Sequence, residues 1–137
     1  MVRVTRPGGG VAACFWSRTG MPALRTFWQT AASLDDRVHR EPRRLGTEEG
    51  DIGALLDRAG AVDIEQGVVA ARAGYADFDD WWDPFTLGIG PAGAYVQTLD
   101  EIRRAELREA TRTALGEPIG PFTQEARAWF ARGVVAS

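Results

Sequence analysis

The first hydrophobic segment of the chain is an unbroken apolar run at residues 11–16, which follows a turn at residues 6–10. In this turn Pro7 presets φ, and the glycines after it permit positive φ. A run in which every position is apolar is typical of a strand buried on both faces, as in a parallel sheet. The pattern therefore predicts a parallel strand covered by helices on both sides, with Cys14 as a small buried apolar residue.

Two amphipathic helices are predicted to follow this strand. The first begins near Pro22, which the first turn of a helix tolerates. Residues 35–46 are polar and indicate a surface connection, in which His39 is interpreted as a surface histidine. Thr47 is a suitable N-cap for the second helix, and Gly60 a suitable stop. Their apolar stripes have helical spacing and consist of Leu24, Phe27, Trp28, Ala31 and Ala32, and of Ile52, Leu55, Leu56 and Ala59.

The second half of the chain alternates between strand and helix patterns. Residues 62–73 are rich in Val and Ala and predict a strand, whereas residues 77–87 predict an aromatic helix. Thr98 and Glu101 have capping-box spacing for a further helix that extends to about residue 115. The tail at residues 122–135 fits both a helix and one face of a strand, so the pattern leaves it open. This order of elements indicates an α/β layer fold, built as a single structural unit over residues 1–137.

Composition narrows the classes of function. The 137 residues carry a net charge of −3 with arginines dispersed among acidic residues, which argues against a nucleic-acid partner. No apolar run approaches the roughly 20 residues of a membrane-spanning helix, and the N-terminal pattern is not that of a signal peptide. One Cys and one His are too few for a zinc site. We therefore expect a cytoplasmic protein without a metal or a membrane partner.

Aromatic residues are the candidates for substrate binding. Trp81, Trp82 and Phe85 lie on one helical stripe, which is either part of the core or the wall of a substrate pocket. Trp16 ends the first predicted strand at its carboxyl end, where ligand sites form in α/β sheets. It is a candidate for substrate contact, with packing inside the protein as the alternative. No residue stands out as catalytic.

Two further motifs have structural interpretations. Residues 88–93 match G-x-G-x-x-G, but a nucleotide-binding motif of this kind follows a strand, and here a helix precedes it. We interpret the glycines as a helix stop or hinge. Asp77, Asp79, Asp80 and Asp83 fit either a carboxylate site or an N-cap with acidic residues in the first helical turns, and the second interpretation is favoured.

The turn and the first strand also resemble a known family. Val4-Thr5-Arg6-Pro7-Gly8-Gly9-Gly10-Val11-Ala12-Ala13 is similar to the V-L-[KR]-P-G-G turn and the following strand of class I S-adenosylmethionine-dependent methyltransferases. Leu45-Gly46 then leads into a helix with the A-L-L-x-x-A-G pattern at residues 54–60. Residues 75–91 resemble the lid insertion of the branch that methylates small molecules.

This resemblance implies the C-terminal part of a Rossmann-like methyltransferase sheet, with about three strands, flanking helices and a helical lid at about residues 75–98. It implies that an antiparallel strand pair ends the sheet and that the tail is a strand. The activity it implies is transfer of a methyl group from S-adenosylmethionine to a small-molecule acceptor, a reaction that depends mainly on orientation.

The family binds S-adenosylmethionine through a glycine-rich turn after its first strand and an acidic residue at the end of its second. The sequence has neither feature, so we expect a truncated domain that binds no cofactor and is inactive alone. An exposed sheet edge would then favour self-association. The alternatives are a non-catalytic α+β interaction module and a small-ligand-binding domain.

Overall fold

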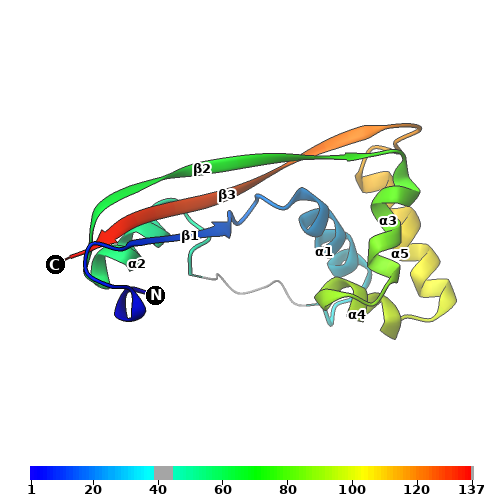
Figure 1. The fold of residues 1–137 in the computed structure, drawn as a ribbon. Coiled ribbons are helices and arrows are strands. Elements are labelled where there is room, and N and C mark those ends of the chain that lie inside the picture. The colour runs from blue at the N-terminus through cyan, green and yellow to red at the C-terminus, as the bar shows by residue number, and fades with distance from the viewer. Residues whose placement is uncertain (39–44, 137) are drawn as a thin grey trace. The chain divides into compact units, whose positions relative to one another are not determined.

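The computed structural model describes residues 1–38 and 45–136 (Figure 1). Contacts within the chain group its residues into two compact units. The sheet unit comprises residues 1–21, 45–71 and 125–136, and the helical unit comprises residues 22–38 and 72–124. The elements are, in chain order, the 3-10 helix η1 (Val2–Val4), β1 (Gly10–Trp16), α1 (Pro22–Leu34), α2 (Asp51–Arg58), β2 (Ala61–Tyr75), α3 (Phe78–Thr86), α4 (Gly90–Thr98), α5 (Glu101–Ala114) and β3 (Phe122–Val135).

The three strands form one sheet in the order β1-β3-β2. β1 is antiparallel to β3, in a register that runs from Gly10 opposite Val134 to Trp16 opposite Ala128. β2 is also antiparallel to β3, so β1 and β2 run in the same direction on either side of the last strand (Figure 1). The strand predicted at residues 62–73 is confirmed, and so is the tail strand that the resemblance implied.

The parallel strand predicted at residues 11–16 is wrong, because β1 pairs with an antiparallel neighbour. Burial on both faces is wrong as well. Val11 is buried, whereas Cys14 and Trp16 are exposed. Side chains alternate across a strand, and only the face that carries Val11 packs against α2 in the described part of the chain. An apolar run therefore did not imply two covered faces here.

The core of the sheet unit lies between this face and α2. Ile52 and Leu56 of α2 pack with Val11, Ala61 and Ala131 of the strands. Near the start of β2, Asp63 has a positive φ of 51°, and Ala61 and Ile64 on either side both contact this core. This three-residue offset departs from strict alternation, as at a β-bulge.

The ends of α2 agree only partly with the prediction. Gly60, in the left-handed region with φ 86°, follows the helix as predicted. Thr47 is not the N-cap, because the helix begins at Asp51 after Gly50. The backbone carbonyl of Thr47 instead accepts hydrogen bonds from Arg18 N and from Trp129 Nε1 at 3.1 Å each. Thr47 thus connects the loop before α2 to the sheet.

The helices of the second unit start where local chemistry favours them. α1 begins at Pro22 as predicted. The side chain of Asp77 caps α3 by accepting a hydrogen bond from Asp80 N at 2.9 Å, which confirms the N-cap interpretation. α5 is capped by Asp100 rather than by Thr98. Thr98 is the last residue of α4, where its hydroxyl donates to the carbonyl of Tyr95 at 2.7 Å, so the capping-box prediction is wrong.

The glycine-rich segment at residues 88–93 separates α3 from α4. Gly88 has a φ of 72° directly after the C-cap residue of α3, and α4 begins at Gly90 with a proline in its first turn. Gly93 packs so closely on the backbone of Gly88 that a Cβ would overlap it. The segment is therefore a helix stop, and its third glycine is required by packing between the turn and α4.

Candidate functional site

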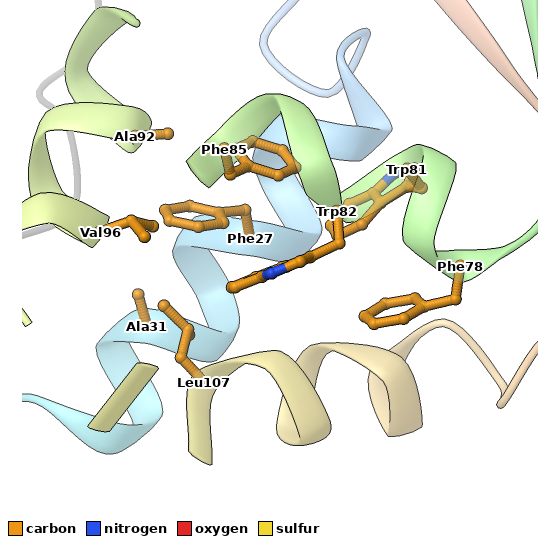
Figure 2. Close-up of a cluster of buried hydrophobic side chains, with 9 residues drawn as sticks. All are labelled: Phe27, Ala31, Phe78, Trp81, Trp82, Phe85, Ala92, Val96 and Leu107. Atoms are coloured by element: carbon orange, nitrogen blue, oxygen red, sulfur yellow. The ribbon is translucent and has the colours of Figure 1, made fainter. Parts of the chain in front are cut away.

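Three of the four predicted substrate-binding residues lie in the core of the helical unit (Figure 2). Trp81 and Trp82 are 1% and 3% exposed, and Phe85 is 9% exposed. Phe27 of α1 stacks on Phe85 with ring centroids 4.6 Å apart. Trp81 Nε1 donates to Gln124 Oε1 at 3.0 Å, so its only polar group is satisfied inside the unit. This burial agrees with the core alternative, and contact of these rings with a substrate stays a prediction.

Trp16 has a different environment. It is the last residue of β1, its side chain is half-buried at 44% exposure, and it belongs to the sheet unit. The four candidates therefore divide between the two units. Substrate contact by Trp16 also stays a prediction.

A cavity of about 350 Å³ opens in the helical unit, where α1 and α4 end beside α5. This volume lies within the usual range for small-molecule pockets. Its lining combines three leucines, a tyrosine, two arginines and three acidic residues: Leu34, Leu99, Leu107, Tyr95, Arg37, Arg103, Asp35, Asp36 and Glu106. The cavity is therefore both charged and partly apolar, as a site for a small amphipathic molecule requires.

Asp35 is the best-connected charged group of the cavity. Its carboxylate accepts Arg37 Nε on Oδ1 and Arg37 Nη2 on Oδ2, both at 2.9 Å, and its Oδ1 also accepts the backbone N–H of Arg37. Tyr95 donates its hydroxyl to Oδ2 at 3.3 Å. The hydrogen bonds from Arg37 hold the pKa of Asp35 at about 2, below the usual 3.8. Burial, and next the charge of Asp35, raise the pKa of Tyr95, so its phenol stays protonated and donates.

We predict that Arg37→Ala raises the pKa of Asp35 from about 2 towards 3.8, because the Arg37 side chain is the main cause of the shift. Tyr95→Phe should raise it less, since the Tyr95 hydrogen bond is the smallest of the causes. NMR titration of the Asp35 carboxyl carbon measures both. Because the folded pKa is depressed, the contribution of Asp35 to stability is present above pH 3.8 and is lost as the pH falls towards 2. An unchanged Asp35 pKa in Arg37→Ala would contradict the ion pair.

The opposite wall of the cavity is formed by α5. Arg103 Nη1 lies 3.3 Å from Glu106 Oε2 one turn along the helix, and Leu107 also belongs to the lining. Arg104 donates through Nη2 to the carbonyls of Val96 and Leu99 at the end of α4. These hydrogen bonds join α5 to the end of α4.

The hydrophobic pattern did not predict this cavity. Its residues come from the end of α1, the end of α4 and the middle of α5, which are far apart in the chain. The available signal was the Asp35-Asp36-Arg37 triplet directly after an amphipathic helix, which we interpreted as part of a surface connection. His39 of the same connection lies outside the described residues.

Three of the four aspartates in the acidic cluster of α3 make structural contacts. Asp77 caps the helix, and Asp80 accepts the N–H of Ala76 on its carboxylate at 2.9 Å. Asp79 forms an ion pair with Arg108 of α5, whose guanidinium also lies over the Phe78 ring, 5.1 Å from its centroid. These contacts join α3 to α5.

Other functional classes find no support in residues 1–38 and 45–136. No group of three or more His, Cys, Asp or Glu side chains in this range is placed to hold a metal ion. None of the helices there has the length and apolarity needed to cross a membrane.

No model of a known protein family matches the chain. No curated protein matches it either.

Proposed function

We propose that this chain is the C-terminal portion of a Rossmann-like class I methyltransferase domain, whose complete form transfers a methyl group from S-adenosylmethionine to a small molecule. The observation that carries the proposal is the position of β3. The resemblance implied a final antiparallel strand pair where the hydrophobic pattern left the tail open, and β3 is a strand inserted between β1 and β2. Doubly wound sheets do contain antiparallel strands, most often at an edge. β3 is instead flanked on both sides, so β1 and β2 share one direction.

The free edge of β1 also supports the proposal. Ser17 N donates to the carbonyl of Arg127 of β3 at 3.0 Å, so Val11, Ala13 and Phe15 share the hydrogen-bonding edge that faces β3. The intervening residues, Ala12 and Cys14 among them, direct their N–H and C=O groups to the opposite edge. β1 carries no charge over its whole length, whereas edge strands are usually protected by charged side chains. Such a strand is suited to pair with a further strand of the same sheet.

The described residues do not fit the methyl donor. The family's donor site needs a strand, a glycine-rich turn and a helix in succession, and the G-x-G-x-x-G match at residues 88–93 follows α3 instead. The backbone of Gly93 also packs directly against the backbone of Gly88, so no space remains beside this glycine for a ligand. In this proposal the chain contributes the far edge of the sheet and the acceptor side of the site, and the donor is held by another segment.

The proposal is tested by calorimetry with S-adenosylmethionine. We expect no measurable binding to the chain alone. The coding DNA upstream of the Met1 codon is expected to encode a strand followed by a glycine-rich turn, and the chain joined to that segment should bind the donor with a Kd on the order of micromolar. Micromolar binding by the chain alone, or an upstream segment without this pattern, would contradict the proposal.

The second candidate is a non-catalytic module that associates through the edge of β1. The exposure of Phe15 and Trp16, at 40% and 44%, beside this uncharged edge favours it. The two functions differ in what precedes the chain. An interaction module needs no donor-binding segment, so the upstream DNA separates them.

A further inference from the structure

The charged side chains that line the cavity of the helical unit differ in how many hydrogen bonds and ion pairs they form. Asp35 accepts four hydrogen bonds, from Arg37 and Tyr95, and so fills the usual acceptor positions of a carboxylate. Glu106 uses Oε2 for Arg103. Asp36 lines the cavity and has no ion-pair partner among residues 1–38 and 45–136. Among the described residues, the carboxylate oxygens that remain able to bind a positive group are therefore those of Asp36 and the Oε1 of Glu106.

The balance of charge favours a cation. Among the described lining residues, three carboxylates face two guanidiniums, and both guanidiniums are engaged by Asp35 and Glu106. α1 and α4 both end at this cavity, with Leu34 as the last residue of one and Leu99 as the C-cap of the other. The C-terminal end of a helix carries partial negative charge, which favours a positive group nearby.

The rest of the lining is apolar or aromatic. Leu34 and Leu99 offer hydrocarbon surface, and the Tyr95 ring adds an aromatic side that packs on Trp28. A ligand that satisfies both parts of the lining has a positive group at one end and a compact apolar body at the other.

We propose that this cavity binds a small primary amine with an apolar or aromatic body. Its ammonium group lies between Asp36 and Glu106, and its body lies on Leu34 and Leu99. The inference rests on the proposed function only in identifying the amine as the methyl acceptor. The binding itself requires the helical unit alone.

The test uses the full chain and three probes of nearly equal shape: benzylamine, benzyl alcohol and benzoate. When benzylamine is added, the backbone amide signals of Leu34, Tyr95 and Leu107 should shift in NMR spectra. The shifts should follow a binding curve with a Kd on the order of 1 mM. Benzyl alcohol should bind more weakly, and benzoate should not shift these residues. Absence of benzylamine shifts at the cavity, or equal shifts with benzoate, would overturn the inference.

Variants with neutral side chains distinguish binding inside the cavity from attraction of the amine by the overall negative charge of the protein. Asp36→Asn should weaken benzylamine binding by about 1.5-fold to fivefold, the range for an exposed ion pair. The double variant Asp36→Asn/Glu106→Gln should abolish the preference for benzylamine over benzoate. Asp83→Asn/Glu109→Gln is the matched control, since it removes the same charge from exposed positions outside the cavity. Equal weakening by both double variants would mean that the cavity does not hold the amine.

The outcomes of this test are independent of the donor experiment. Failure of benzylamine to bind leaves the proposed methyltransferase architecture intact if the joined protein binds S-adenosylmethionine. Conversely, an upstream segment without a donor site leaves an amine-binding helical unit that is not part of a methyltransferase.

Discussion

Replacing Trp81 by alanine is expected to lower the free energy of unfolding of the helical unit by about 3–5 kcal/mol, the usual cost of truncating a large buried aromatic residue. The side chain is 1% exposed, and its ring lies 4.9 Å from that of Phe85 and 5.9 Å from that of Phe78. Alanine leaves a cavity among these rings and removes the hydrogen bond to Gln124. Urea unfolding followed by far-ultraviolet circular dichroism measures the loss.

Two variants make this prediction specific. Trp81→Phe keeps most of the ring and loses the Nε1 hydrogen bond, so it should cost less than the alanine variant and remain folded. Trp16→Ala removes the same type of side chain from a half-exposed position at the end of β1 and should cost less than about 1 kcal/mol. If Trp81→Ala and Trp16→Ala destabilise equally, Trp81 is not part of the core that Figure 2 shows.

Helical periodicity predicted the helical unit well because a stripe of large apolar residues on a helix has one low-energy arrangement, in which it is buried against other elements. Phe27 and Ala31 of α1 and the stripe of α3 all lie in one core cluster (Figure 2). The pattern could not say whether the same stripe would also line a pocket, since core and pocket walls use the same residue types. The contacts of Trp82 and Phe85 with Phe27 agree with the core alternative.

The sheet was predicted less well because strand direction and face coverage are not local properties. Residues 11–16 give the same pattern whether their neighbour is parallel or antiparallel, and the neighbour, β3, lies more than a hundred residues later in the chain. The tail itself fitted two periods, so its strand followed from the resemblance. Cys14 is exposed because the face it shares with Trp16 is not covered by the described residues.

The cavity could not be predicted because it depends on where two helices, α1 and α4, end beside α5. Asp35 follows the last residue of α1, and Tyr95 is 60 positions later on α4, yet their side chains share a hydrogen bond. A sequence pattern places such residues on a polar face or in a connection. It does not indicate that the ends of two helices meet the same stretch of α5.

Replacing Gly20 by alanine is the substitution with the largest expected effect in the sheet unit. Gly20 is buried, and a Cβ would overlap the carbonyl oxygen of Arg127 and the hydroxyl of Ser17. Its own carbonyl accepts the N–H of Arg127 at 2.8 Å, and Ser17 N donates to the Arg127 carbonyl at 3.0 Å. The extra methyl group must therefore separate this loop from β3, at a cost of about 1–3 kcal/mol for the overlap and about 1 kcal/mol for each hydrogen bond lost.

The experiment compares Gly20→Ala with Gly10→Ala, in which the new Cβ meets no atom within 4 Å. Urea unfolding should show a loss only for Gly20→Ala. Hydrogen exchange adds a local measurement, because the amides of Ser17 and Arg127 should lose protection in Gly20→Ala and keep it in Gly10→Ala. If both amides stay protected in Gly20→Ala, the loop accommodates the methyl group without leaving β3. The connection from β1 towards α1 is then held by contacts other than this close approach.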